Sequence, residues 1–231
     1  MIGILGGTTL YNVEYLSKGK GRAVDTKFGP ADVIAGDGFV FINRHGKGGD
    51  ILPHRINHRA NISALREAGC DKIISFSSVG SLKREIPPES IILPHDYISF
   101  CPTPTVFDSG IVHVTPEIDG GLRDIIIGVA KRINVEVIEG GVYFQTPGPR
   151  LETKAEINLL KDYADIVGMT MASEATLSRE LNMAFANICS VDNYAHGILD
   201  EKLDFNKILE EASCKRDTII KLMTAVIEEL K

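Results

Sequence analysis

The chain contains 231 residues, of which 44% are hydrophobic and 24% are charged, and its formal net charge is −6. These values are ordinary for a globular protein and exclude a disordered, fibrous or membrane-spanning class. The acidic balance provides no basic surface for nucleic acid, and the length fits one domain over residues 1–231 with one large core.

Predicted strands and helices alternate along the chain. Short apolar runs predict strands at residues 2–5, 39–43, 72–77, 90–93, 141–144, 165–169 and 187–192. Helically spaced apolar residues predict helices at 56–68, 122–132, 154–163 and 174–181, and a terminal helix from 204. Most of the strands are continuous apolar runs, which is typical of strands covered on both faces. This order predicts an α/β protein with a mostly parallel or mixed central β-sheet flanked by helices.

One segment follows neither pattern. Residues 94–121 are rich in Pro, Thr, Ser, Asp and Gly, which predicts a long surface loop. Loops of this length in a compact domain are usually functional or lie between subunits. We therefore expect this loop to contribute to a site or to a subunit contact.

Small and hydroxyl-bearing residues follow several predicted strands. They form the segments Gly6-Gly7-Thr8-Thr9, Ser77-Ser78-Val79-Gly80-Ser81 and Gly168-Met169-Thr170. Ligands of open α/β sheets bind at the carboxyl ends of strands, where free N–H groups and hydroxyls suit an anion. Arg44 and His45 follow the strand at 39–43 and add a cation. Turn formation explains each segment alone, but four that converge predict a phosphate site.

Several alternative sites lack a required residue. A dinucleotide site needs Gly-x-Gly-x-x-Gly before a helix, and residues 3–8 do not supply it in register. His54 and His58 have the spacing of a zinc protease, but the intervening Glu is absent and Pro53 places the pair across a helix start. The cysteines contain no Cys-x-x-Cys pair. We predict free phosphate or a small phosphate ester as ligand, no metal and, since no signal peptide pattern is present, a cytoplasmic location.

Six motifs occur in collinear order along nearly the whole chain. They are Ile2-Gly3-Ile4-Leu5-Gly6-Gly7-Thr8, Arg44-His45-Gly46, Pro53-His54-Arg55-Ile56-Asn57, Ser78-Val79-Gly80-Ser81-Leu82, Gly148-Pro149-Arg150-Leu151-Glu152-Thr153 and Val167-Gly168-Met169-Thr170. Together these motifs resemble the purine nucleoside phosphorylase and methylthioadenosine phosphorylase family. The chain departs from the family pattern at Thr9, His58 and Pro147.

The resemblance implies a fold, a reaction and an assembly. The fold would be a single-domain nucleoside phosphorylase sandwich around a mixed sheet. The assembly would be a homotrimer, or a dimer of trimers, with active sites near the subunit contacts. The reaction would be phosphorolysis, in which inorganic phosphate attacks the anomeric carbon and the purine leaves. Phosphate is then a co-substrate, and no cofactor is implied.

The matching positions also imply a role for individual residues. Phosphate would be bound by Thr8, Arg44, His45, Ser77, the Ser78 backbone and Thr170. Met169 would pack on the ribose and Leu151 on the base, and His113 would reach the neighbouring subunit's site from the long loop.

The base pocket separates two branches of the family. Adenosine-type members carry two Asp flanking a Tyr, and a small hydroxyl residue where Glu152 stands; here the two Asp positions are Asn193 and Ala195. Adenine has an acceptor at N1, whereas 6-oxopurines have an N1–H donor that a Glu152 carboxylate can accept. Asn193 can donate to N7 or O6 of such a base. The pair predicts a 6-oxopurine substrate with Glu152 and Asn193 as catalytic residues; alternatively, Glu152 is a helix-start residue and Asn193 a turn former.

The terminal helix refines the substrate. Inosine-type members place a His there to meet the 5′-hydroxyl, and alignment puts Phe205 at this position, followed by Ile208 and Leu209. An apolar wall leaves a hydroxyl unpaired and suits a methylthio group, although helical spacing also explains the three as core residues. We predict phosphorolysis of 5′-methylthioinosine, with inosine or guanosine as further substrates. The alternatives are a 5′-methylthioadenosine phosphorylase and a non-catalytic purine or phosphate sensor.

Overall fold

Four apolar segments from distant parts of the chain form the parallel centre of one sheet. In the computed structural model, which describes residues 1–11, 13–200 and 215–231, β1 (Ile2–Gly6) lies between β4 (Phe39–Asn43) and β5 (Lys72–Ser81). The other side of β5 pairs in parallel with β10 (Ala184–Tyr194) along its whole length. The prediction at 39–43 is confirmed to the residue, whereas β5 and β10 extend beyond the predicted bounds.

The remaining strands make this sheet mixed. The full sheet has ten strands, and its main path runs β2-β3-β4-β1-β5-β9-β8-β7. Its outer strands are β2 (Lys20–Thr26), β3 (Gly29–Ala35), β6 (Ile91–Ile92), β7 (Asp96–Ser99), β8 (Val142–Gln145) and β9 (Ile166–Gly168). The pairs β2–β3, β3–β4 and β5–β9 are antiparallel, as is β6 on β10, whereas β7, β8 and β9 run parallel to one another. The predicted α/β class with a mixed sheet is confirmed.

Three strands were not predicted from the sequence. β2 is exposed over most of its length and carries charged residues, so it lacks both an apolar run and clear alternation. β3 holds a Pro and alternates only weakly, and it is fixed by pairing with β2 and β4. β7 lies within residues 94–121, which were predicted to form a loop, so that prediction is wrong for Asp96–Ser99. Each of these strands is stabilised by pairing with a strand that is distant in the sequence or that itself has only a weak strand pattern.

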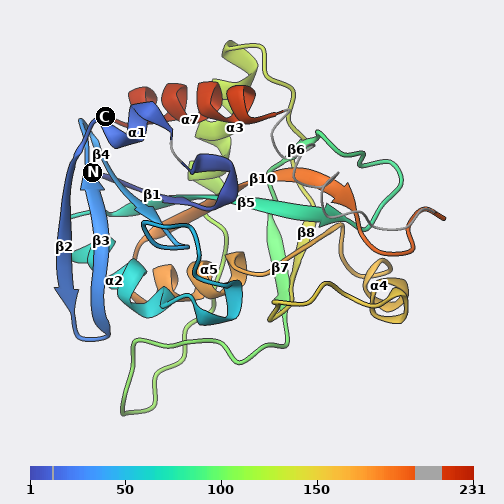
Figure 1. Cartoon of the computed structure of the whole chain (residues 1–231), viewed down its shortest axis with the longest axis horizontal. Helices are drawn as coiled ribbons and strands as arrows, with labels where there is room; N and C mark the ends of the chain where they lie inside the picture. Colours follow the sequence, from blue (N-terminus) through green and yellow to red (C-terminus); the bar gives the residue numbers. More distant parts are fainter. Residues whose placement is uncertain (12, 201–214) are drawn as a thin grey trace.

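Helices cover the two faces of the sheet (Figure 1). One face carries α1 (Glu14–Ser17), α3 (Gly120–Arg132) and α7 (Arg216–Leu230), and the other carries α2 (His58–Glu67) and α5 (Met171–Glu180). Successive strand residues alternate between two apolar clusters, so that strands with continuous apolar runs are buried on both sides. None of the helices in the described ranges is long and apolar enough to cross a membrane.

Side-chain caps decide where several helices begin. The Asn57 side chain accepts a hydrogen bond from the Ala60 N–H, so α2 starts at His58 and not at the predicted residue 56. α4 (Lys154–Leu160) opens with a capping box of Thr153 and Glu156. Short 3₁₀ turns lie at η1 (Thr8–Leu10) and η2 (Pro53–Arg55).

The terminal helix is described only from Arg216 onward. The helix predicted from residue 204 therefore falls partly outside the described residues, as do Phe205, Ile208 and Leu209. The described part packs by one stripe, as predicted, with Leu222 and Met223 fully buried against the sheet.

Leu222 provides a test of this packing. We expect Leu222→Ala to lower the free energy of unfolding by about 2–5 kcal/mol, because it removes buried methyl groups and leaves a cavity. Urea denaturation measures the change. On the same helix, Glu229 forms an exposed ion pair with Arg132, and Glu229→Ala should cost less than about 1 kcal/mol. Equal costs for the two variants would contradict the packing of α7 on the sheet.

Candidate active site

A gap in the sheet creates the candidate site. β1 pairs with β5 as far as Ser75, and β9 joins the same side of β5 only at Gly80. Within the described chain, no strand pairs with residues 76–79 on that side. The interruption exposes backbone groups and side chains in the interior of the sheet, which a ligand can reach.

A cavity of about 340 Å³ opens at this gap. It brings together predicted residues from five separate regions of the chain, which are Arg44, His45, Ser77, Ser78, Leu151, Glu152, Met169, Thr170, Asn193 and Ala195. One expectation about its construction is corrected: Gly168 ends a strand that runs antiparallel to β5, so the site is not a simple row of carboxyl ends. The turn after β9 reaches the cavity because β9 meets β5 near the end of that strand.

Two glycines permit the close approaches that shape the cavity. A Cβ atom on Gly7 would lie 2.6 Å from Arg44 Nη1. A Cβ atom on Gly168 would lie 2.3 Å from the Tyr143 hydroxyl oxygen, which accepts a hydrogen bond from the Thr170 N–H at 3.2 Å. Any side chain at either position would displace a polar group of the site.

Arg44 is the cation at one end of the cavity, and it is 3% exposed. Its Nε donates to Glu174 at 2.6 Å, Nη2 donates to the Ser75 hydroxyl at 2.7 Å and Nη1 donates to the Phe76 carbonyl at 2.8 Å. The Ser75 hydroxyl in turn donates to Glu174 at 2.6 Å. These bonds fix the guanidinium and compensate its charge. One N–H of Nη1 has no partner in the described part of the chain and can bind an anion.

His45 lies beside Arg44 with one ring nitrogen already engaged. Its Nδ1 lies 2.6 Å from the Ile51 carbonyl oxygen, which assigns the proton to Nδ1 and leaves Nε2 as an acceptor. Burial lowers the pKa of His45, the Ile51 carbonyl opposes this change, and the charge of Arg44 lowers the pKa further. A neutral His45 can therefore accept a hydrogen bond from a protonated phosphate oxygen or a sugar hydroxyl.

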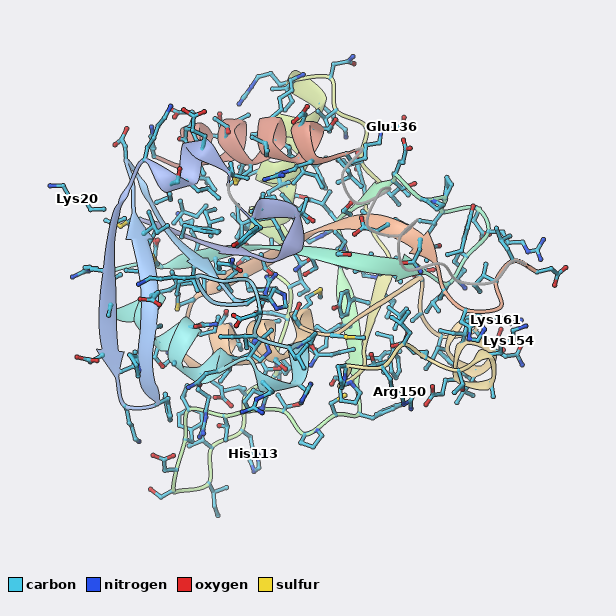
Figure 2. The ribbon with its side chains drawn as sticks, in the orientation of Figure 1. Lys20, His113, Glu136, Arg150, Lys154 and Lys161 are labelled. Carbon is cyan, nitrogen blue, oxygen red and sulfur yellow. The ribbon has the colours of Figure 1, made fainter. Side chains whose placement is uncertain are left out.

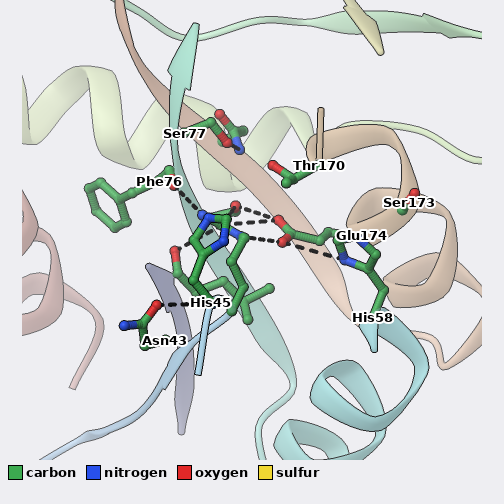
Figure 3. Close-up of polar contacts among 12 residues, drawn as sticks. Asn43, His45, His58, Phe76, Ser77, Thr170, Ser173 and Glu174 are labelled. Carbon is green, nitrogen blue, oxygen red and sulfur yellow. Dashed lines mark hydrogen bonds and ion pairs between the residues drawn. The ribbon is translucent and has the colours of Figure 1, made fainter. Parts of the chain in front are cut away.

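His58 lies on the far side of Glu174 (Figure 3). Its Nδ1 is 3.8 Å from Glu174 Oε1 and has no hydrogen-bond partner among the residues described. Burial lowers the pKa of His58 to about 4, so the ring is neutral at pH 7 and the contact is not an ion pair. His54 lies in η2 and is exposed, which confirms that the two histidines lie across a helix start.

Glu152 lies at the other end of the cavity and is 9% exposed. Its Oε1 accepts a hydrogen bond from the Thr146 hydroxyl at 2.7 Å, and no cation within the described residues pairs with it. Glu152 directly precedes Thr153, the N-cap residue of α4, but that helix is capped by Thr153 and Glu156. The alternative interpretation as a helix-start residue therefore does not account for the buried position of its side chain.

Asn193 faces the same end of the cavity from β10. The ladder between β10 and β5 is shifted between Val191 and Asn193, and this bulge changes the direction of the side chains that follow. Asn193 Nδ2 donates to the Tyr194 carbonyl at 2.8 Å, so one of its two N–H groups is already used. The second N–H and the side-chain oxygen can contact a ligand, and Ala195 leaves space beside them.

Several buried polar residues around the site were missed by the sequence analysis. Gln145 Nε2 donates to the Ser173 hydroxyl at 2.8 Å, which supports the start of α5. Ser78 donates its hydroxyl to buried Asp192, which also accepts from Ser190 at 2.5 Å. A polar residue inside an otherwise apolar strand was the signal that could have indicated them, because buried polar groups almost always have a hydrogen-bond partner.

Two other predicted site residues are not among the described lining of this cavity. Thr8 lies in η1 next to Gly7, and its side chain lies outside the described structure. His113 is exposed on the long loop and does not line the cavity of its own chain (Figure 2). That loop is tied to α5, because the Val106 N–H donates to Glu180 at 2.8 Å.

The match of a family model shows that the protein is a phosphorylase. The phosphorylase superfamily model matches residues 1–228, and the chain belongs to this family. Within this superfamily it is an enzyme of the nucleoside phosphorylase family, a pentosyltransferase. The family resemblance predicted from the sequence motifs is confirmed.

Relatives align with the whole chain. A probable 6-oxopurine nucleoside phosphorylase of Archaeoglobus fulgidus is 44% identical, with 100% of this chain and 97% of that protein covered. A probable S-methyl-5′-thioinosine phosphorylase of Methanothermobacter thermautotrophicus is 39% identical, with 100% and 85% covered. A solved structure of methylthioadenosine phosphorylase from Schistosoma mansoni, in complex with adenine, superposes on this chain with a TM-score of 0.92. The two sequences are 24% identical, and the superposition covers 99% of this chain and 91% of that one. This similarity supports the fold.

Buried His58 and half-buried His45 predict a loss of stability at low pH. Since the pKa of His58 is about 4 when folded and about 6.5 when unfolded, the unfolded state binds more protons between these values. The free energy of unfolding should therefore fall as the pH drops through this window, by on the order of 3 kcal/mol for His58, with His45 acting in the same direction. Urea denaturation at pH 7.5 and pH 4.5 measures the change.

Matched histidine variants identify the source of this effect. His58→Phe should make the pH dependence of unfolding shallower, whereas His54→Phe should leave it as in the unmodified protein because His54 is exposed. If both variants retain the full dependence, His58 is not its cause.

Proposed function

We propose that the enzyme cleaves 6-oxopurine nucleosides with inorganic phosphate, and that 5′-methylthioinosine is its preferred substrate. The products are then hypoxanthine and 5-methylthioribose 1-phosphate, and inosine and guanosine are further substrates. The observation that carries this proposal is the position of Glu152, which is buried at the cavity, hydrogen-bonded to Thr146 and without a paired cation among the described residues.

Hydrogen-bond complementarity links Glu152 to the base. A carboxylate only accepts hydrogen bonds, and one oxygen of Glu152 already accepts from Thr146. The second oxygen can accept the N1–H of a 6-oxopurine, whereas it would face a lone pair at N1 of adenine. The free N–H of Asn193 can donate to N7 or O6 of the same base. A 6-oxopurine therefore satisfies both side chains.

The opposite end of the cavity suits phosphate. Arg44, Ser77 and Thr170 line it, and the guanidinium is held in place before any ligand arrives. Cleavage of the glycosidic bond develops positive charge on the sugar and negative charge on the purine, and preorganised groups stabilise both. Phosphate at the Arg44 end and donors at the base end match this separation of charge. Met169 also lines the cavity and would pack on the ribose.

The choice of 5′-substituent rests on sequence and on relatives. Phe205, Ile208 and Leu209 would form an apolar wall that suits a methylthio group. Relatives of Methanothermobacter thermautotrophicus and Methanocaldococcus jannaschii, both 39% identical, carry the name probable S-methyl-5′-thioinosine phosphorylase. A 38% identical relative of Thermofilum pendens is named an S-methyl-5′-thioadenosine phosphorylase, and Glu152 is the feature that argues against that activity here.

We also propose the assembly and location that the resemblance implied. In a homotrimer, or a dimer of trimers, exposed His113 would reach the 5′ end of a neighbouring subunit's site from the long loop. The enzyme would act in the cytoplasm as one domain over residues 1–231, with phosphate as co-substrate and no cofactor or metal.

Exchanging the base-pocket residues should change the preferred base. We expect Glu152→Ser combined with Asn193→Asp to shift the kcat/KM ratio toward 5′-methylthioadenosine over 5′-methylthioinosine by about tenfold or more, since the N1 acceptor is removed and an adenine-reading carboxylate is introduced. Phosphate-dependent release of each base measures the ratio, with inosine as a third substrate. Faster cleavage of the adenine nucleoside by the unmodified enzyme would overturn the assignment of Glu152.

A further inference from the structure

A chain of three buried polar side chains leads to the phosphate end of the cavity. Asn187 and Ser77 lie on neighbouring strands β10 and β5, and Asn187 Nδ2 donates to Ser77 Oγ at 3.0 Å. The Cys189 thiol donates to Asn187 Oδ1 at 2.7 Å. Asn187 and Cys189 are fully buried, whereas Ser77 lines the cavity.

The Asn187 amide has a defined orientation between Cys189 and Ser77. Cys189 is a free cysteine, and burial raises the pKa of its thiol well above the usual value, so it stays protonated and can donate. In the structure the thiol donates to the amide oxygen, so Oδ1 and not Nδ2 faces Cys189. The Nδ2 group therefore faces Ser77, to which it donates a hydrogen bond.

The amide in turn determines what Ser77 offers to a ligand. A serine hydroxyl has one proton and two acceptor sites, and one acceptor site of Ser77 is occupied by the Asn187 N–H. The hydroxyl proton is directed away from that donor, and Ser77 donates to no other residue in the described ranges. Its remaining free direction is the cavity, on the side where Arg44 and Thr170 lie.

We propose that Asn187 is a positioning residue that directs the Ser77 hydroxyl proton toward phosphate. Phosphate oxygens accept hydrogen bonds, so a Ser77 lone pair pointed at them would repel the anion whereas an O–H group binds it. Because Glu174 already compensates the charge of Arg44, fixed neutral donors such as this hydroxyl carry a large share of phosphate recognition. The role of Asn187 depends on the proposed function in one respect only, which is that phosphate binds at this end of the cavity.

Reversing the polarity of residue 187 tests the proposal. Asn187→Asp keeps the size of the side chain but, when ionised, accepts from Ser77 and turns its proton away from the cavity. We expect the KM for phosphate to rise about tenfold or more, while the KM for the nucleoside changes less than about threefold. Asn187→Ala only releases the hydroxyl, so its KM for phosphate should rise about three- to tenfold.

A double-mutant cycle separates this role from charge or packing effects. Ser77→Ala alone should raise the KM for phosphate about tenfold, and adding Asn187→Asp or Asn187→Ala to it should cause much less further change than in the unmodified enzyme. Asn158→Asp on exposed α4 is the matched control for a change in net charge, and it should leave both KM values unchanged. Thermal unfolding of each variant verifies that it is folded, and the Ala series provides the test if Asn187→Asp does not fold.

Several outcomes would overturn the role of Asn187. They are an unchanged KM for phosphate in both Asn187 variants, a parallel rise in both KM values, or equal effects in the presence and absence of Ser77. The base preference is tested separately, because the same series can be run with 5′-methylthioadenosine if that nucleoside is cleaved faster. Failure of the 6-oxopurine assignment and failure of the Asn187 proposal are therefore distinguishable.

Discussion

A charged side chain that leaves water costs several kcal/mol unless it is paired and hydrogen-bonded, and this constraint governs the centre of the molecule. Arg44 and Glu174 are separated by 130 positions and meet where the sheet is interrupted, with Ser75 bonded to both. Arg44 follows β4, Ser75 lies on β5 and Glu174 lies on α5. The ion pair therefore requires three elements to take fixed positions, and the cavity exists only when they do.

The same pairing decides how the site can recognise an anion. Since the charge of Arg44 is compensated within the protein, the phosphate end of the cavity works through oriented donors more than through net charge. Neutral His45 offers an acceptor that is oriented by its bond to the Ile51 carbonyl. The Ser77 hydroxyl and the remaining Arg44 N–H are donors whose directions are set by buried partners. Such donors need little reorganisation when a ligand binds, which is the property that stabilises developing charge in a transition state.

Much of the candidate site was predictable because its residues cluster in short motifs. Arg44, His45 and Thr170 each belong to a segment whose composition indicated an anion, and Glu152 belongs to a motif that carries the family resemblance; the structure places all four at one cavity. The residues that orient them were not predictable in this way. Their partners lie far away in the chain, and polar residues such as Asn187 within an apolar strand carry no local signal that distinguishes a relay from an isolated buried group.

The sequence by itself determined the α/β class, the buried parallel strands and the chemical groups available for phosphate and purine, because hydrophobic periodicity and residue type are local properties. Only the tertiary structure decided that β9 meets β5 in the antiparallel direction, that the sheet is open at residues 76–79, and that β2, β3 and β7 are strands. Strand order and register depend on long-range pairing and on the shared burial of both faces. These contacts form only when the whole chain is packed together.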